Sequence, residues 1–170
     1  MKKIICLDVE TTGVDIHNDE ILQLSLIDQN FEVLFNEYLR PPTKQSWKTA
    51  QRFNGISPEM VMNNKTLLDY RYRIEELINS ADVLVGYNLK SYDIPIIKSN
   101  GIYIDDSINV FDVMLEFPQI YGEVSGNYNW QKLTKCAEYY DYQFNAHDSL
   151  EDTKATLHCY YKISEEIGLK

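Results

Sequence analysis

The sequence predicts an α/β fold in which a mixed β-sheet is flanked by helices. Three strand-like stretches come first along the chain, and helical and strand-like stretches alternate after them. This succession is typical of a mixed sheet with helices packed on its faces. The chain has 170 residues, of which 44% are hydrophobic, which suffices for one domain with a buried core, so we expect a single domain over residues 1–170.

The first strand is predicted over residues 2–9, at the centre of the sheet. Residues 4–7 are continuously apolar, as in strands that are buried on both faces. Residues 20–28 and 31–39 are predicted to form an antiparallel hairpin, because apolar and polar residues alternate in the second of the two stretches.

Helices and two short strands are predicted over the rest of the chain. The pattern turns helical after Pro41-Pro42, with a stop at Asn54-Gly55 and a new start at Ser57-Pro58-Glu59. Further helices are expected at about residues 67–79, 91–99, 112–120, 130–140 and 149–166. Short strands are expected at residues 83–86 and 108–111, and Gly122 to Asn127 is expected to be a loop.

The overall charge disfavours polyanion binding, but one stretch of the chain is basic. The formal net charge is −10 and the pI about 4.7, so the field of the whole molecule repels nucleic acids. Between Glu37 and Glu59 there is no acidic residue. The positive residues of this basic stretch are Arg40, Lys44, Lys48 and Arg52.

Cysteine usage and the start of the chain bear on the compartment. The chain has 3 cysteines, far apart and without a CxxC pair, which fits a reducing compartment. The apolar run after Lys2-Lys3 ends at Asp8, too early for a signal peptide, and no stretch is long enough to cross a bilayer. We therefore expect a cytoplasmic protein that does not contact membranes.

Two carboxylates lie at the C-terminal end of the predicted central strand. Asp8 and Glu10 occupy positions i and i+2, so both side chains point to one face of the sheet. Ligands bind outside the carboxyl ends of strands in open α/β sheets, and adjacent carboxylates repel unless a cation lies between them. Such oxygen ligands suit Mg²⁺ or Mn²⁺. Alternatively, Asp8 caps the turn formed by Thr11, Thr12 and Gly13.

Two more carboxylates and a histidine stand at predicted helix starts. Asp93 is expected in the first turn of the helix after the strand at residues 83–86, where a carboxylate also favours the helix dipole. Asp148 and Glu151 have capping-box spacing, which places His147 at N′ and Asp152 at N4. These two positions meet in a hydrophobic staple, so we expect an imidazole and a carboxylate in contact. The alternative is a plain surface His–Asp pair.

Taken in order, these motifs resemble those of the DEDD 3′-to-5′ exonucleases. The similarity is to their DEDDh branch, which includes proofreading exonuclease domains and RNase T-like RNA-trimming enzymes. Asp8 to Gly13 is similar to the first motif, Val85 to Asp93 to the second, and His147 to Asp152 to the third. Phe53 to Met60 also resembles a segment that the family carries between its first two motifs.

Three residues depart from the pattern of the family. They are Tyr87, Tyr92 and Ser149, where histidine, phenylalanine and alanine are usual. Each replacement is similar in size or character, so these departures bear on substrate preference more than on catalysis.

The resemblance implies a ribonuclease H-like fold with a five-stranded mixed sheet, and a 3′-to-5′ exonuclease that releases nucleoside 5′-monophosphates. Its mechanism implies two divalent cations, Mg²⁺ or Mn²⁺, one generating the attacking hydroxide and one stabilising the leaving 3′ oxygen. Asp8 bridges both ions in this scheme, Glu10 and Asp152 support the water-activating ion, and Asp93 the other. His147 takes the proton from the attacking water.

The substrate implied is the 3′ end of single-stranded nucleic acid. The predicted substrate-binding residues are Thr11, Thr12, Gly13, Phe53, Asn54 and Asn88. The alternative for Phe53 is a core position at the end of a helix. The basic stretch, interleaved with Trp47 and Phe53, is a candidate path for the strand. The residues do not distinguish DNA from RNA, or a chain working alone from one acting as a homodimer or beside a polymerase.

Two other functions are consistent with parts of the pattern. Phosphatases of the haloacid dehalogenase type carry the motif Asp-x-Asp-x-Thr. Asp8 to Thr12 differs from it only at the third position, where Glu10 is one carbon longer than aspartate. Asp8 would then be a nucleophile. This alternative leaves His147 and Asp152 without a role. A catalytically silent ribonuclease H-like interaction module is the non-enzymatic alternative. Degenerate modules usually lose a carboxylate, whereas this chain keeps all of the motif residues.

Overall fold

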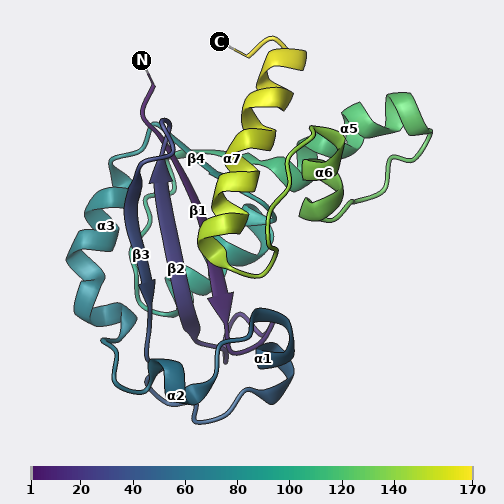
Figure 1. Ribbon diagram of the computed structural model, residues 1–170. Helices are drawn as coiled ribbons and strands as arrows, with labels where there is room; N and C mark the ends of the chain where they lie inside the picture. Colours follow the sequence, from purple (N-terminus) through teal and green to yellow (C-terminus); the bar gives the residue numbers. More distant parts are fainter. Residues whose placement is uncertain (1, 170) are drawn as a thin grey trace.

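The first strand of the chain lies at the centre of a five-stranded sheet with the order β3-β2-β1-β4-β5 (Figure 1). The computed structural model describes residues 2–169. Its strands are β1 Ile4–Thr11, β2 Ile21–Asp28, β3 Val33–Tyr38, β4 Val83–Gly86 and β5 Asn109–Asp112. β1 pairs antiparallel with β2 and parallel with β4, so the sheet is mixed, as predicted.

Helices account for most of the remaining regular structure. They are α1 Lys48–Asn54, α2 Pro58–Val61, η1 Leu67–Tyr70, α3 Arg71–Asn79, η2 Leu89–Asp93, α4 Ile94–Ser99, α5 Val113–Ser125, α6 Leu133–Tyr139 and α7 Ser149–Glu166. The predicted helix at residues 67–79 begins as the 3₁₀-helix η1, and the one at 91–99 begins as the π-helix η2. No helix within residues 2–169 combines the length and apolar character needed to span a bilayer.

The prediction that Gly122 to Asn127 is a loop is wrong for its first four residues, Gly122 to Ser125. Helix α5 continues to Ser125 and ends where Gly126 adopts a left-handed conformation with φ 73°. Gly122 is buried because the ring of Tyr128 packs directly against it, and a Cβ at this position would overlap the ring. Glycine serves here as a packing surface, which local sequence patterns do not distinguish from a loop residue.

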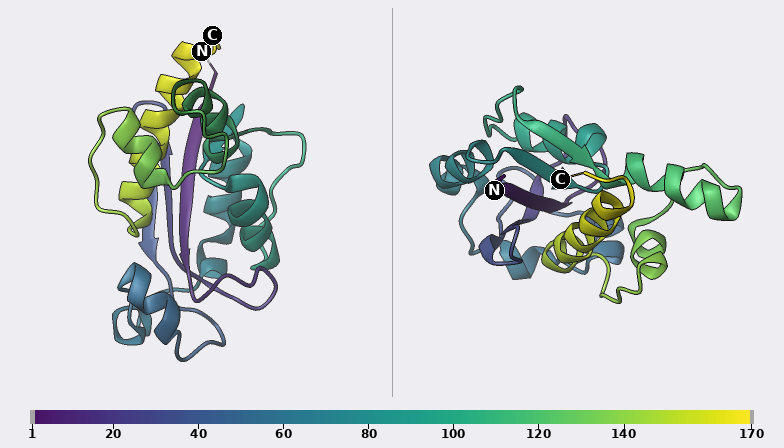
Figure 2. Two further views of the ribbon diagram at one scale, coloured as in Figure 1. Left: turned by 90° about the vertical axis from the view of Figure 1, so that its right-hand side faces the viewer. Right: turned by 90° about the horizontal axis from the view of Figure 1, so that it is seen from above.

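Strand alternation divides the core between the two faces of the sheet. Ile5, Leu7 and Val9 of β1 join the cluster that includes α3 and α4. Cys6, which points the other way, joins the cluster formed with α5, α6 and α7. Figure 2 shows α3 and α7 on opposite sides of the sheet. Because side chains alternate along a strand, Asp8 lies on the α7 face together with Cys6.

A third, smaller cluster supports the segment between β3 and α2. Trp47 is only 5% exposed and packs with Leu22, Ile56 and Val61. Its indole Nε1 donates a hydrogen bond of 2.7 Å to the carbonyl oxygen of Ile56. Trp47 therefore stabilises the packing of the segment between β3 and α2 against β2. The expectation that Trp47 lines a path for nucleic acid is wrong, because its side chain is buried.

Candidate active site

Four carboxylates from three parts of the chain meet at the C-terminal end of β1. Asp8 and Glu10 of β1 and Asp152 of α7 each offer an oxygen, and these oxygens all lie within 4.8 Å of one another. Asp93, at the end of η2, is 3% exposed and is close enough for its charge to act on Asp8. We call these four residues the acid cluster. The structure thus brings together the four acids that the sequence motifs singled out.

Polar residues of β2 explain why helix α7 starts next to the acid cluster. Asp8 lies opposite Ser25 and Glu10 opposite Gln23 in the β1–β2 pairing, so these side chains share one face. The Oγ atoms of Ser25 and Ser149 are 2.5 Å apart, and the Gln23 Oε1 accepts a bond of 3.3 Å from the Ser149 backbone N–H. Both contacts are buried. They hold the first turn of α7 against the sheet.

The start of α7 is capped as predicted, with one difference at His147. Asp148 is the N-cap, and its carboxylate accepts bonds from the N–H groups of Leu150 and Glu151. The carboxylate of Asp152 accepts a 2.9 Å bond from the backbone N–H of His147, where contact with the imidazole was expected. His147 has φ 73°, and its exposed ring lies edge-on to the ring of Phe53 with centroids 6.4 Å apart.

Burial and mutual repulsion make the acid cluster retain protons in the absence of a cation. Burial raises the pKa of Asp8 well above its usual value, and the charge of Asp93 adds to this. Burial likewise raises the pKa of Asp93 to about 8 and that of Asp152 to about 7. The pKa of Glu10 rises to about 7, again mainly by burial, although a hydrogen bond with Asn54 opposes the shift. All ligand atoms are carboxylate oxygens, which fits a hard divalent cation.

Thr11, Thr12 and Gly13 form a tightly bonded turn directly after the acids of β1. Thr11 Oγ1 is 2.7 Å from the carbonyl oxygen of Gly13 and 2.7 Å from the hydroxyl of Tyr92. Thr12 Oγ1 donates a 2.8 Å bond to Asp19. A Cβ at Gly13 would overlap the Asp19 carboxylate, which would have to move away from the turn.

Phe53 and Asn54, at the end of α1, lie at the edge of the site. Phe53 is 66% exposed, so the alternative of a core position is wrong. The Asn54 Nδ2 donates a 3.2 Å bond to the carbonyl oxygen of Thr11, and the same side chain bonds the Glu10 carboxylate. Asn54 therefore joins α1 to the acid cluster and leaves Phe53 facing outward.

The second-motif loop, which follows β4, is held by contacts that the sequence did not reveal. Asn88 adopts a left-handed conformation with φ 64°, and its N–H donates a 2.9 Å bond to the buried carboxylate of Asp112. The hydroxyl of Tyr92 bonds the Gly13 carbonyl at 2.7 Å, which gives a reason for tyrosine where the family usually has phenylalanine. Asp112 ends β5 at the same edge of the sheet. Because ligands in open α/β sheets bind outside the carboxyl ends of strands, this position could have been predicted from the sequence.

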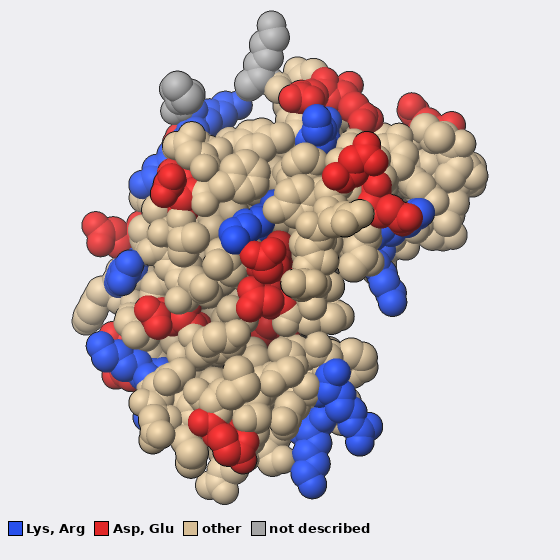
Figure 3. Space-filling view, in the orientation of Figure 1, with Lys and Arg blue, Asp and Glu red and all other residues tan. Residues whose placement is uncertain are grey.

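Positive side chains of the basic stretch lie close to this edge of the molecule. Figure 3 shows Lys and Arg side chains projecting where α1 lies in Figure 1, beside a hollow in the surface below the α5 and α6 region. Lys48 and Arg52 of α1 and Arg40 are exposed. Lys44 forms a 3.3 Å ion pair with Asp19, so part of its charge is already neutralised.

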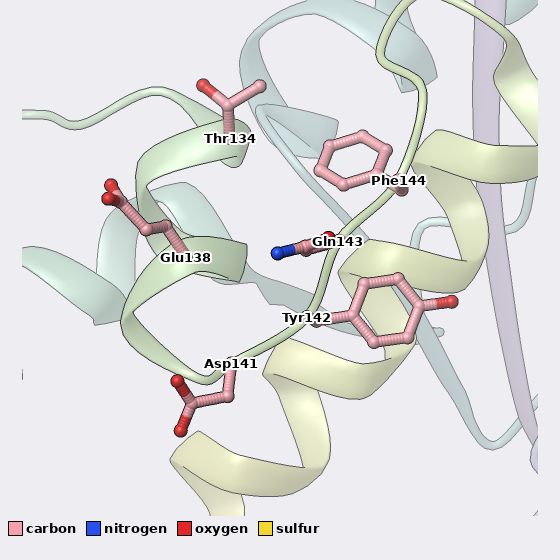
Figure 4. A pocket seen from close by; sticks show the side chains of 6 residues that line it. All are labelled: Thr134, Glu138, Asp141, Tyr142, Gln143 and Phe144. Atoms are coloured by element: carbon pink, nitrogen blue, oxygen red, sulfur yellow. The ribbon is translucent and has the colours of Figure 1, made fainter.

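A pocket of about 620 Å³ lies between α6 and the segment that leads to α7 (Figure 4). Its lining residues are Thr134, Glu138, Asp141, Tyr142, Gln143 and Phe144. The pocket carries two carboxylates of its own and includes no residue of the acid cluster. It is separate from the candidate active site.

A five-stranded mixed sheet with acids at the carboxyl end of its central strand defines the ribonuclease H-like class of folds. Solved structures agree. The chain superposes on Escherichia coli exonuclease I in its zinc-bound complex with single-stranded DNA, with a TM-score of 0.80 and 19% identity, over 99% of this chain and 42% of the other. Another structure of exonuclease I gives a TM-score of 0.78. The predicted fold is confirmed.

The chain belongs to the exonuclease family of the RNase T type, whose family model matches residues 5–160. It is 27% identical over 179 aligned residues to a PolC-type DNA polymerase III of Caldanaerobacter subterraneus subsp. tengcongensis, covering 99% of this chain and 12% of the polymerase. It is 26% identical to RNA exonuclease 4 of Saccharomyces cerevisiae, covering 96% of this chain and 55% of that protein. The chain thus spans only part of each relative. The expected membership of the DEDD exonucleases is confirmed.

Proposed function

We propose that this chain is a metal-dependent 3′-to-5′ exonuclease that removes nucleotides from single-stranded nucleic acid. The observation that carries the proposal is the convergence of carboxylates from β1 and α7, with oxygens within 4.8 Å of one another. Such a group is unfavourable without a cation, because like charges at this distance raise one another's pKa. The family membership and the fold of the single-stranded DNA complexes support the same function.

The acid cluster would hold two divalent cations, Mg²⁺ or Mn²⁺. Bound there, such ions supply a hydroxide nucleophile at neutral pH and charge stabilisation for the leaving 3′ oxygen. Asp8 is placed to serve both ions because its carboxylate is the one on which Asp93, Asp152 and Glu10 all act. The bond from the His147 backbone N–H keeps the Asp152 carboxylate oriented toward the cluster.

We assign His147 as the general base. Its ring is exposed and its backbone N–H bonds Asp152 of the acid cluster, so we assign the ring to take a proton from a water molecule at the site and pass it to solvent. The backbone bond to Asp152 and the left-handed φ of 73° hold the residue in a single backbone conformation. Its ring remains available for proton transfer.

Phe53 and the basic stretch are assigned to grip the strand. Phe53 is exposed beside the His147 ring, where it can stack on a terminal base, and base stacking on one aromatic ring contributes about 1–3 kcal/mol without sequence preference. The turn from Thr11 to Gly13 offers backbone at close approach to the terminal nucleotide. Exposed positive groups such as Lys48 and Arg52 would meet phosphates of the strand upstream.

The decisive experiment uses 5′-labelled single-stranded DNA and RNA oligonucleotides with Mg²⁺, with Mn²⁺, and with EDTA. We expect a ladder that shortens from the 3′ end, a nucleoside 5′-monophosphate as product, and no cleavage with EDTA or with Asp8→Ala. The comparison of DNA with RNA gives the substrate preference. Lack of cleavage of both substrates would refute the proposal and favour a silent interaction module.

The haloacid dehalogenase alternative makes a separate prediction. It requires a phosphoryl-aspartate at Asp8, which hydroxylamine would cleave. In the structure, Asp8 lies among three other carboxylates, an environment suited to cations and unfavourable for attack on a phosphate monoester without them.

A further inference from the structure

Asp112 is a buried carboxylate at the carboxyl edge of the sheet that the proposed mechanism does not use. It ends β5 and is 2% exposed. Its carboxylate accepts three backbone hydrogen bonds. The donors are Asn88 N–H at 2.9 Å, Lys90 N–H at 2.9 Å and Met114 N–H at 3.1 Å. An isolated buried charge is costly, so these bonds are needed to retain it.

Helix capping accounts for only one of the three bonds. Asp112 is the N-cap of α5, and the bond from Met114 is the usual capping bond. The bonds from Asn88 and Lys90 cross to a different segment, the loop that follows β4. Serine or asparagine would cap α5 equally well, so capping does not explain a carboxylate with both oxygens engaged.

The loop that Asp112 holds has an unusual backbone. Asn88 has φ 64° and ψ 24°, a left-handed conformation that is uncommon for residues other than glycine, asparagine and aspartate. The next residues, Leu89–Asp93, form a π-helix, a rare structure that is frequent at functional sites. Asp93 is the last residue of that helix, so the bonds to Asp112 fix the start of the segment whose end enters the acid cluster.

The strand pairing places Asp112 rigidly under this loop. β4 and β5 pair in parallel with Gly86 opposite Asp112, so the carboxylate lies beside the residue from which the loop departs. The side chain of Leu89 packs so closely on Gly86 that a Cβ there would lie 2.8 Å from the Leu89 Cβ. The loop is thus held by Asp112 on its polar side and by Gly86 on its apolar side.

From this geometry we propose that Asp112 is a positioning residue that holds the Asn88–Asp93 segment so that the Asp93 carboxylate faces the other acids. It holds this segment through hydrogen bonds to the backbone of Asn88 and Lys90, and its own side chain is buried. The inference rests on the proposed function, because it assigns Asp93 to the cation site. Groups that orient metal ligands typically change metal affinity by about 10–100-fold when they are removed.

The test measures Mn²⁺ binding in the absence of nucleic acid, by calorimetry or by the electron paramagnetic resonance of free Mn²⁺. Asp112→Asn replaces the oxygen that accepts from Lys90 with an NH₂ donor, and we expect Mn²⁺ binding to weaken about 10–100-fold. Asp112→Ser keeps the cap of α5, and the same loss is expected. Amide hydrogen exchange at Asn88 and Lys90 should accelerate in both variants.

Asp28→Asn is the matched control. Asp28 also accepts two backbone N–H groups, from Asn30 and Glu32, but in the turn after β2, and it pairs with Ile5 at the other end of β1 from the acids. We expect it to leave Mn²⁺ affinity unchanged. If both Asp112 variants bind Mn²⁺ as the wild-type chain does, the positioning role is refuted. If the wild-type chain binds no Mn²⁺, the cation site of the proposed function fails, and this inference fails with it.

Discussion

Replacing Asp8 with asparagine should make the metal-free protein more stable and at the same time abolish its stabilisation by metal. The substitution keeps the shape of the side chain and removes one charge from the acid cluster. Asp8 is the residue on which the charges of Asp93, Asp152 and Glu10 all act. Its removal therefore relieves repulsion that no cation compensates in the metal-free state.

The magnitude follows from the distances in the site. Carboxylate oxygens of Asp8, Glu10 and Asp152 lie within 4.8 Å of one another, and two unit charges at that separation repel by roughly 3.5 kcal/mol at an effective dielectric constant of about 20. Bound protons relieve part of this, because burial raises the pKa of Asp8 well above its usual value and that of Asp93 to about 8. We expect a net gain of about 1–3 kcal/mol near pH 8, or roughly 3–10 °C in Tm for a chain of this size.

The assay is thermal unfolding with EDTA and with saturating Mn²⁺. At about 100 times its dissociation constant, a ligand stabilises the native state by about 2.7 kcal/mol, so the wild-type Tm should rise with Mn²⁺. Asp8→Asn should show the higher Tm in EDTA and little response to Mn²⁺. Glu123→Gln, which removes a charge from an exposed position on α5, controls for net charge and should behave as wild type.

Two results would refute this reasoning. An Asp8→Asn variant that is no more stable than wild type in EDTA would show that the carboxylates do not repel one another as their distances imply. A variant that keeps the full Mn²⁺ response would show that the cation binds elsewhere.

Four further predictions follow from the site. Since the acid cluster has raised pKa values, its contribution to stability is present below about pH 4 and lost as the pH rises through about 7 to 8. The Tm of the metal-free protein should therefore fall between about pH 4 and pH 8 and level off above that range, and a rise over it would contradict the raised pKa values of the acids. His147→Ala should lower turnover by on the order of 10²–10⁴ with Mn²⁺ affinity retained, and unchanged turnover would remove His147 from the mechanism. Phe53→Ala should weaken oligonucleotide binding by about 1–3 kcal/mol while Phe53→Tyr does not, and equal affinities would exclude stacking. The salt dependence of binding should have a log-log slope of about −2, because Lys44 is already paired with Asp19 and three positive groups of the basic stretch remain for phosphates. A flat slope would mean that these groups do not contact the strand.

The sequence predicted the strands and most helices because their patterns are local. The continuous apolar run in β1 and the cap at Asp148 depend on neighbours a few residues away. Expectations failed where a distant contact decided the outcome. Tyr128 packs on Gly122 within α5, and Trp47 is buried by residues of β2 and α2.

The candidate acids were also predictable from the order and spacing of their motifs. Their supports were not. Gln23 and Ser25 reveal their role only when β2 lies beside β1 and α7 docks on it, and Asp112 only when β5 lies beside β4. Each of these contacts joins residues far apart in the chain, so no local pattern encodes them.

The sequence by itself therefore determined the fold class and the family, and it singled out the four acids and the histidine as the candidate site. The tertiary structure decided how those groups are held. In it, the Asp152 carboxylate accepts a hydrogen bond from the backbone N–H of His147, and Phe53 lies exposed beside the His147 ring. The physical reason is that chemistry depends on side-chain type and spacing, which the sequence carries directly. Orientation and pKa depend on burial and on neighbours that only folding brings together.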